Sequence, residues 1–447
     1  MGKLKKMFYT MINNSIERSM LLSLLCKPLS MVVSLIYTPV LLHYLDEEAY
    51  GIWATILSIV NWINYFDVGI ANGVRNILTI HIEQKEELEA KKDVSTAYTT
   101  LTCISSIIFL IGSIFILSIN DHLFFNTEID VKPAFEVSFF FICINFVLSL
   151  SKIMLYAINK AEKVSIMSLL TQFVNLCGIV ILSFMNEGNM LYVAILVGMS
   201  GMIVNFCFLI WIWSKHQYLY PTFKMFSKDR LKNIGNIGLK FFLIQVSGMV
   251  LYSTDNLIIA RLFGPINVTP YQTTYSAFGI VNALYAAALT PLWAQFAIAK
   301  ERKNYTWIKK TIRRLEKTLL IIGGILLFGC VFYKSIAFMW LQKKLNYDAG
   351  LIIMTAVYNF FYIWSSIYVI ACNGMGRIDL QLYLSIVGAL LNIPLSYFFG
   401  YILHMRSTGV LLATVVCVLI AAIPVACDTY KYLNKMCVIN EISLIEE

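Results

Sequence analysis

The chain has 447 residues, of which 59% are apolar and only 14% are charged, with a mean hydropathy of +0.72 and a formal net charge of +9. A soluble protein carries nearer 25% charged residues, so the composition excludes a soluble globular protein and predicts a membrane protein with many spans. The ten cysteines and five histidines are scattered. They show neither Cys-x-x-Cys nor His-x-x-x-His spacing, so we expect no disulfide framework, no metal site and no cofactor.

Twelve apolar segments follow one another along the chain, and each is long enough to cross the roughly 30 Å hydrocarbon core as a helix of about 20 residues. The sequence therefore predicts an all-α membrane protein with twelve transmembrane helices. The segments cover residues 19–45, 49–66, 96–118, 134–156, 165–184, 190–213, 237–262, 271–294, 318–340, 350–371, 380–402 and 408–427.

Lysine and arginine are distributed unevenly over the connections between these segments. With the N-terminus in the cytoplasm, the cytoplasmic segments hold 26 of the 35 Lys and Arg residues, and the external loops hold four. Because positive charge is concentrated on the cytoplasmic side of membrane proteins, we expect both termini in the cytoplasm. The net positive charge is then a signal of topology and does not indicate a nucleic-acid partner.

The first apolar segment contains Lys27 and Pro28 about two turns from its cytoplasmic end. A lysine at membrane depth costs about 2.5–3.5 kcal/mol on insertion scales, so it normally faces a hydrated cavity, a partner or the interface. Pro28 removes a backbone donor and should bend the helix, as at a gate. A polar stripe runs along one face of this helix: Lys27, Ser30, Ser34 and Thr38. We therefore expect Lys27 to face a polar interior.

The end of the second segment carries glycines and charges close to the expected cytoplasmic mouth. Gly69 and Gly73 allow close helix approach or an unwound exit, and Asn72 lies between them. Asp67 and Arg75 are two turns apart. A gate is one interpretation of these residues, but by chemistry alone an ordinary capped helix end facing water fits them better.

Lys152 in the fourth segment and Lys240 in the seventh lie at a similar expected depth, in the cytoplasmic half of the bilayer. Lysine offers an anion such as phosphate a point charge and three donors, so both residues are candidates for an anion-binding cavity. Each also lies three to five residues from the end of its segment, where the ammonium group can reach the inner headgroups. The residues alone leave both interpretations open.

Asp255 lies past the middle of the seventh segment, toward the outside. An acid at this depth can take up a proton or a sodium ion and so drive a conformational switch. The alternative is an ion pair with Arg261 or Lys334.

Residues 295–317 hold eight cations interleaved with aromatic and aliphatic residues. This pattern predicts a basic amphipathic helix on the inner leaflet, where anionic lipids attract it. Gathering of a diphosphate-linked lipid is the more specific alternative.

A weak internal repeat divides the chain into two halves. Residues 157–163 and 371–377 share the pattern Ala-x-Asn-x-x-x-cation, six spans apart. An even number of spans gives both halves the same orientation, which predicts a parallel repeat with a cleft between the halves. We expect six-helix bundles at 1–214 and 215–447.

Two stretches resemble a known family. Residues 65–76 read Tyr-Phe-Asp-Val-Gly-Ile-Ala-Asn-Gly-Val-Arg-Asn, and residues 373–386 read Asn-Gly-Met-Gly-Arg-Ile-Asp-Leu-Gln-Leu-Tyr-Leu-Ser-Ile, followed by Asn-Ile-Pro-Leu-Ser at 392–396. Both are similar to segments of the repeat-unit flippases of bacterial surface polysaccharide synthesis, the O-antigen and capsule flippases of the polysaccharide transporter family. The resemblance extends over nearly the whole chain.

The resemblance implies two six-helix bundles around a central cavity that opens alternately to the two sides of the bacterial inner membrane. It also implies the substrate, an undecaprenyl-diphosphate-linked oligosaccharide moved from the inner to the outer leaflet, and work beside a polysaccharide polymerase and a chain-length regulator. In such flippases a cationic cavity is thought to hold the diphosphate. The candidates in this chain are Lys27, Lys152 and Lys240, with Arg75 at the mouth.

Two alternatives remain. A multidrug or cation antiporter of the same superfamily should carry more acid than base in its cavity, whereas lysine dominates the apolar segments here. A membrane enzyme, such as a glycan polymerase or an acyltransferase, needs a catalytic cluster in a sizeable loop or mouth. The external loops are short and the histidines dispersed, so we expect a transporter with no catalytic residues.

Overall fold

The computed structural model describes residues 15–66, 70–119, 125–185 and 188–446, and all regular structure in these ranges is helical. The side chains of some helical residues lie outside the description, among them Lys27, Asn72, Gly73 and Lys240. The chain forms two compact units, Met1–Phe242 (unit 1) and Leu243–Glu447 (unit 2). The expected bundles at 1–214 and 215–447, the cavity between them and the N-in, C-in topology stay predictions.

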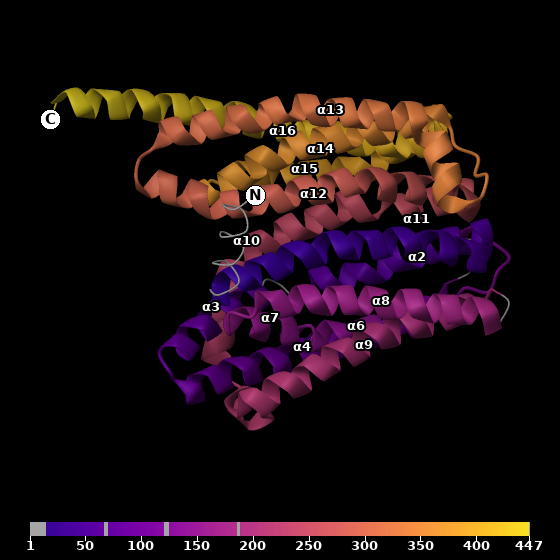
Figure 1. Ribbon diagram of the computed structural model, residues 1–447, viewed down its shortest axis with the longest axis horizontal. Helices are drawn as coiled ribbons and strands as arrows, with labels where there is room; N and C mark the ends of the chain where they lie inside the picture. The colour runs from indigo at the N-terminus through magenta and orange to yellow at the C-terminus, as the bar shows by residue number, and fades with distance from the viewer. Residues whose placement is uncertain (1–14, 67–69, 120–124, 186–187, 447) are drawn as a thin grey trace, which may run out of the picture. The chain divides into compact units, whose positions relative to one another are not determined.

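Unit 1 is built from long helices joined by short turns. They are α2 (Ser15–Val60), η1 (Asn61–Tyr65), α3 (Ile70–Glu83), α4 (Glu87–Ser118), α6 (Lys132–Leu148), α7 (Leu150–Ala157), α8 (Ala161–Met185), α9 (Met190–Lys215), η2 (Gln217–Leu219), η3 (Phe223–Met225) and the start of α10 (Lys228–Ser253). Helix α2 lies beside α8, and α6 packs between α4 and α9 (Figure 1). The connection after α9 packs on α4 through η2 and η3.

Helix α2 joins two of the expected spans. Its backbone leaves helical geometry at Asp46, where φ is 66° and ψ is −176°. This left-handed φ is unusual for a residue other than glycine, and the Asp46 carboxylate compensates by accepting a hydrogen bond from the backbone N–H of Ala49 at 3.0 Å. The break therefore lies between the expected segments 19–45 and 49–66, while Pro28 is inside the first helical part.

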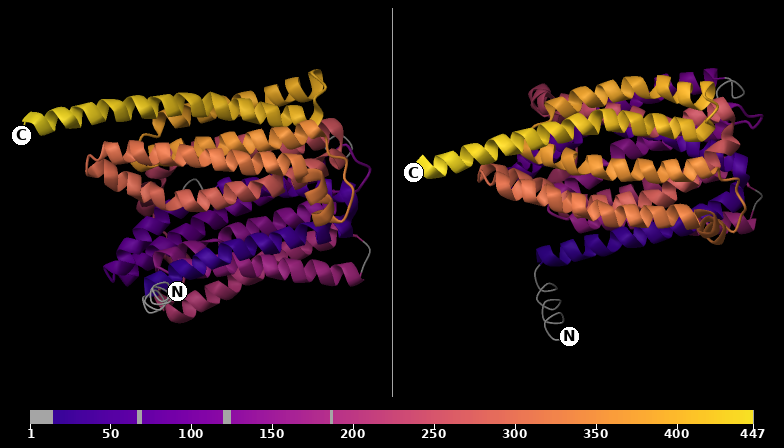
Figure 2. Two further views of the ribbon diagram at one scale, coloured as in Figure 1. Left: turned by 45° about the horizontal axis from the view of Figure 1, so that its top comes forward. Right: turned by 90° about the horizontal axis from the view of Figure 1, so that it is seen from above.

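Unit 2 contains the end of α10 and α11 (Asp255–Phe263), η4 (Pro265–Asn267), α12 (Val268–Glu301), α13 (Tyr305–Leu341), α14 (Ala349–Met375), α15 (Asp379–Tyr397), the π-helical turn η5 (Phe398–Ile402) and α16 (Arg406–Glu446). Helix α14 is central, because it packs against α12, α13 and α16. Both views of Figure 2 show the C-terminal part of α16, in yellow, extending past the other helices.

The described residues contain eleven helices that are long and apolar enough to cross a membrane. The first runs from Pro28 to Tyr65 and includes the kink, so it takes the place of two of the twelve expected spans. Large apolar side chains are exposed along them, such as Leu320 at 78% and Val331 at 76% on α13. This is expected of helices whose outer faces meet lipid, and the prediction of an all-helical membrane protein is confirmed.

The basic stretch 295–317 does not form a separate surface helix. Its first part ends α12, and its second part is the start of α13, which continues without a break into an apolar span. Ile308 and Ile312 are fully buried, while Arg313 and Arg314 are exposed. The amphipathic pattern is real, but its apolar side packs inside unit 2.

Candidate functional site

A polar cavity of about 350 Å³ lies within unit 1, and Lys152 lines it. Four amide side chains from four other elements share the lining: Asn64 of η1, Asn145 of α6, Gln172 of α8 and Asn205 of α9. A charged and amide-rich cavity among helices of this hydropathy is a candidate binding site for a polar ligand.

A break between two helices lies just before Lys152. Helix α6 ends at Leu148, and α7 begins at Leu150 after Ser149, whose hydroxyl donates to the carbonyl of Phe146 at 2.6 Å. Lys152 therefore lies in the first turn of a short helix. Its ammonium group forms no ion pair among the described residues.

Hydrogen bonds hold two of the cavity amides in place. The Asn145 Nδ2 group donates to the carbonyl of Gly198 at 3.1 Å, and the Asn205 Nδ2 group donates to Asn145 Oδ1 at 3.1 Å. Ser151, beside Lys152, donates to Asn205 Oδ1 at 3.2 Å. The lining is thus preorganised by contacts between α6, α7 and α9.

Gln172 is the exception in this cavity. Its Oε1 atom is buried and has no hydrogen-bond partner among the described residues. Buried polar atoms are normally paired, by water or a ligand if not by protein. An unpaired ammonium group and an unpaired amide oxygen in one cavity can together bind a ligand that offers both an anion and hydroxyl donors.

Arg75 does not line this cavity, but it contacts the helix that carries Lys152. Its guanidinium carbon lies 4.5 Å from the ring centroid of Tyr156 on α7, a cation–π contact. Because residues four apart share one face of a helix, Tyr156 and Lys152 lie one above the other on α7.

The other predicted site residues of the N-terminal region are not all described. Asp67 and Gly69 lie outside the described residues, as do the side chains of Lys27, Asn72, Gly73 and Lys240. Pro28 is exposed within α2.

Asp255 is the first residue of α11, directly after an interruption at Thr254, and its side chain is only 4% exposed. The carboxylate accepts hydrogen bonds from the Tyr271 hydroxyl of α12 at 2.7 Å and from Thr414 Oγ1 of α16 at 3.2 Å. Neither Arg261 nor Lys334 pairs with it, and the described residues hold no other ion pair to Asp255.

A second layer of hydrogen bonds surrounds Asp255 within unit 2. Asn392 Nδ2 of α15 donates to Thr414 Oγ1 at 3.1 Å, and Thr254 Oγ1 donates to Asn392 Oδ1 at 3.4 Å. Thr414 and Asn392 are both fully buried. Asp255 is thus enclosed by hydroxyl and amide groups from α12, α15 and α16 and from Thr254, an environment that suits a proton or a small cation rather than an oligosaccharide.

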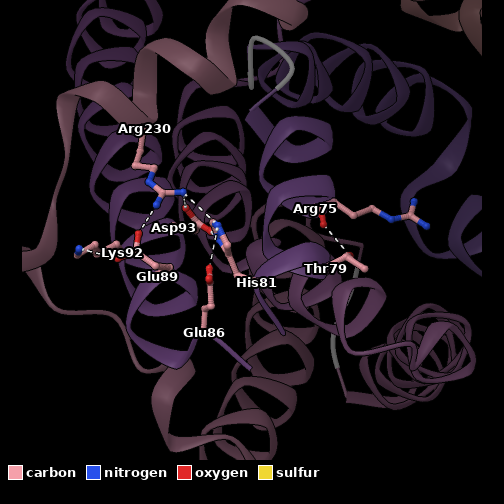
Figure 3. A network of polar contacts seen from close by, with 8 residues as sticks. All are labelled: Arg75, Thr79, His81, Glu86, Glu89, Lys92, Asp93 and Arg230. Carbon is pink, nitrogen blue, oxygen red and sulfur yellow. Dashed lines mark hydrogen bonds and ion pairs between the residues drawn. The ribbon is translucent and has the colours of Figure 1, made fainter. Parts of the chain in front are cut away.

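The structure also shows an ionic cluster that sequence reasoning missed (Figure 3). Asp93 of α4 is fully buried, and its carboxylate meets His81 Nδ1 of α3 at 2.5 Å and Arg230 Nη1 of α10 at 3.4 Å. Arg230 also pairs with Glu89, which binds Lys92 at 2.7 Å.

The cluster fixes the start of α10 to α3 and α4. No local pattern reveals it, since Arg230 is distant from the others in sequence. Figure 3 shows the Arg75 guanidinium group pointing away from it.

The described residues contain no group of three or more His, Cys, Asp or Glu side chains placed to hold a metal ion.

A family model for polysaccharide biosynthesis proteins matches residues 16–297, which is more than half of the chain. The chain belongs to this polysaccharide biosynthesis protein family. Among its relatives are two described as putative O-antigen transporters. The protein of Salmonella typhimurium is 22% identical over 391 residues, covering 84% of this chain and 87% of the relative, and that of Salmonella typhi is 20% identical over 363 residues, covering 78% and 81%. The resemblance seen in the sequence is confirmed.

Solved structures show the fold of this family member. An inward-facing multidrug resistance MATE family transporter of the MOP superfamily superposes with a TM-score of 0.73 at 15% identity, over 93% of this chain and 98% of the other. An outward-facing structure of such a transporter gives a TM-score of 0.68 at 16% identity, over 95% and 97%. At these identities the likeness establishes a MATE-like fold. The family and its relatives agree with the expectation of a transporter rather than an enzyme.

Proposed function

We propose that this protein is a flippase that moves undecaprenyl-diphosphate-linked oligosaccharide repeat units from the cytoplasmic to the outer leaflet of the bacterial inner membrane, for O-antigen or capsule assembly. The family match and the relatives described as putative O-antigen transporters support this proposal. The observation that carries it is the cavity of unit 1, where Lys152, which forms no ion pair within the described ranges, lies among amides.

The hard step in this transport is moving the diphosphate, whose negative charges must leave water. The Lys152 ammonium group supplies a charge and donors that replace part of the lost hydration. The free Oε1 of Gln172 and the side chain of Asn64 can bond to the hydroxyl groups of sugars, which both donate and accept hydrogen bonds. Asn145 and Asn205 donate both Nδ2 hydrogens to protein oxygens, so toward a sugar they can only accept, through Oδ1. The polyprenyl tail stays in lipid throughout.

The remaining cations of the expected path are Lys27, Lys240 and Arg75. Arg75 lies over Tyr156, one turn from Lys152, which makes it a suitable first contact for an incoming phosphate. We assign the segment with Asp67, Gly69, Asn72 and Gly73, together with Pro28, to the gate at the cytoplasmic mouth.

We assign ion coupling to Asp255. A buried carboxylate without a cationic partner is energetically costly, and a proton or a sodium ion would remove that cost. Its binding would change the hydrogen bonds from Tyr271 and Thr414, and so the packing of α11 against α12 and α16. This is a route from ion binding to conformational change.

Anionic lipids are the expected partners of the exposed cations at the start of α13, such as Arg313 and Arg314. A polysaccharide polymerase and a chain-length regulator are the proposed protein partners. A drug or cation antiporter remains the rival function within this fold. The lysine and amides of the unit 1 cavity favour an anionic sugar lipid over a cationic drug.

The test is the leaflet distribution of the lipid-linked repeat unit in cells that depend on this protein. We expect Lys152→Gln to make the intermediate accumulate on the cytoplasmic leaflet, with export reduced at least about tenfold, because a charge-assisted hydrogen bond to phosphate is lost. Lys160→Gln is the matched control, since it removes the same charge from an exposed position in the turn between α7 and α8. Normal export by Lys152→Gln at equal protein levels would place the diphosphate elsewhere.

A further inference from the structure

A second and larger cavity, of about 690 Å³, lies at one end of unit 2. It forms where α13 ends and where α12, α14 and α16 begin. In the expected orientation this is the outer end of the unit, because the connections around residues 264–267, 342–348 and 403–405 are external. Nothing in the proposed path through the unit 1 cavity uses it.

Cations dominate the charged groups of this cavity. Lys334 of α13 and Arg406 of α16 both line it, and His404 lies beside Arg406. Lys334 and Arg406 are exposed, and neither forms an ion pair within the part of the chain that the structure describes. Lys334 is seven residues before the end of α13 and contributes to the cavity lining from there.

The one carboxylate among the lining residues is already engaged. Asp348 Oδ1 accepts a hydrogen bond from the backbone N–H of Gly350 at 3.2 Å, and Oδ2 accepts one from Thr408 Oγ1 at 2.9 Å. These bonds cap α14 and tie it to α16. Asp348 therefore belongs to the wall of the cavity, and with its carboxylate counted against Lys334 and Arg406 the lining keeps an excess of one positive charge.

The backbone at Arg406 is held in an unusual conformation. His404 and Arg406 have φ values of 55° and 50°, in the left-handed region that residues other than glycine adopt only when their surroundings impose it. The turn η5 precedes them, and α16 packs on it so closely that a Cβ atom at Gly409 would lie 2.5 Å from the Phe399 carbonyl. This close packing of α16 on η5 holds the backbone at Arg406 in place. The three helix starts around the cavity add partial positive charge to that of the side chains.

Neutral groups and size distinguish this cavity from a site for a simple ion. Asn267, Asn346 and Ser407 line it with amide and hydroxyl groups. Its volume falls in the range of small-molecule sites, whereas an inorganic ion would fill only a small part of it. The lining therefore matches a ligand that has many hydroxyl groups and at least one negative charge.

We propose that this cavity binds a saccharide that carries a carboxylate or phosphate group, with Lys334 and Arg406 on the acid and the amides on the sugar hydroxyls. In transport it would receive the acidic sugar of a repeat unit at the outer side of the protein. That role rests on the proposed flippase function, whereas the binding itself does not.

The test measures binding to the purified full chain in detergent by calorimetry, with three probes: a glucuronic-acid-containing disaccharide, a neutral disaccharide of the same size, and inorganic phosphate. We expect saturable binding of the acidic disaccharide that weakens with salt.

The double variant Lys334→Gln/Arg406→Gln should weaken binding of the acidic disaccharide at least about tenfold, since charge-assisted hydrogen bonds are lost. The control Lys431→Gln/Lys435→Gln removes two exposed charges from the other end of α16 and should leave binding unchanged. Equal melting temperatures would show that all variants are folded.

The proposal would be overturned by no saturable binding of the acidic disaccharide, by equal binding of the neutral one, or by unchanged binding in the Lys334/Arg406 variant. Phosphate that binds as tightly as the acidic disaccharide would also overturn it, since the site would then recognise only an ion. The variant Lys152→Gln separates this proposal from the flippase function. Export is scored in Lys152→Gln cells, whereas binding at the unit 2 cavity is scored as the disaccharide binding lost when Lys334→Gln/Arg406→Gln is added to the Lys152→Gln protein. Either result can therefore fail without the other.

Discussion

Lys152 and Asp255 are both charged residues within apolar helices, yet the fold surrounds them differently. Lys152 opens on a cavity with four amides, while Asp255 is enclosed by hydroxyl groups from Tyr271 and Thr414. A charge that faces a cavity is accessible to a large ligand, and a charge inside a closed cage is accessible only to a proton or a small cation. Therefore we assign the glycan to the first and the coupling ion to the second.

The assignment of Asp255 leads to a prediction at the residue scale. Asn in its place keeps the size and an oxygen acceptor for Tyr271, but it can neither ionise nor take up a proton. We expect Asp255→Asn to fold normally, to lower export at least about tenfold, and to make the remaining export insensitive to collapse of the ion gradients. The measurement is accumulation of the lipid-linked repeat unit with and without an ionophore.

Asp130→Asn is the control for this experiment, because Asp130 is an exposed acid near the start of α6. Its export should match that of the unaltered protein and should still respond to the ionophore. Export by Asp255→Asn that responds normally would instead show that the carboxylate is structural.

Interrupted helices mark both candidate sites at the scale of secondary-structure elements. The break at Ser149 precedes Lys152, and the break at Thr254 precedes Asp255. Both breaks are slight, because Ser149 and Thr254 keep φ and ψ angles of the right-handed helical region. The backbone N–H of Ser149 donates to the carbonyl of Asn145 at 2.8 Å, and that of Ile258 donates to the carbonyl of Thr254 at 3.0 Å. The breaks therefore mark the positions of the two sites, and the polar groups of each site come from side chains.

Close packing of α6 against α9 holds the unit 1 cavity, and glycine makes this packing possible. A Cβ atom at Gly198 would lie 2.3 Å from the ring of Phe141, whereas one at Gly324 of α13 would meet nothing within 4 Å. We expect Gly198→Ala to destabilise the protein by about 1–3 kcal/mol through overpacking. Gly324→Ala, in an exposed helical position, should be neutral or stabilise by up to about 1 kcal/mol. Thermal unfolding in detergent measures both, and equal melting temperatures would contradict this account of the interface.

At the scale of the whole molecule, helix α10 is the segment through which the chain passes from unit 1 to unit 2. Its first turn is fixed by Arg230, which binds Glu89 and Asp93 on α4. The preceding connection is docked as well, because the backbone N–H groups of Thr222 and Ser227 donate to the hydroxyls of Ser95 and Thr96. The start of α10 therefore belongs structurally to unit 1, although the helix continues into unit 2.

This docking gives a prediction for the stability of the whole protein. Asp93→Ala removes a fully buried carboxylate and leaves Arg230 and His81 without it, so we expect a loss of about 3–5 kcal/mol. Lys92→Gln affects a partly exposed pair with Glu89 and should change stability little. Denaturation in detergent should separate the two variants clearly. Similar melting temperatures would mean that the cluster does not fix α10.

The sequence predicts most of the helices, because each apolar run is a local property that a bilayer selects directly. It also predicts the family, from residues 65–76 and 373–396, and it marks Lys152 and Asp255, since a charge in an apolar run is visible without a structure. It predicts a separate amphipathic helix at 295–317, where the structure has the end of α12 and the start of α13, because periodicity shows that a helix has an apolar side but not what that side packs against.

By itself, then, the sequence determines an all-helical membrane protein of the polysaccharide biosynthesis family and the charged residues that membrane burial makes costly. Only the tertiary structure decides which side chains meet. The amides around Lys152, the hydroxyls around Asp255, the carboxylates around Arg230 and the unit 2 cavity of Lys334 and Arg406 come from helices far apart in the chain. Such contacts leave no local pattern, because a polar residue in a span looks the same in sequence whether it faces a cavity, a partner or a headgroup.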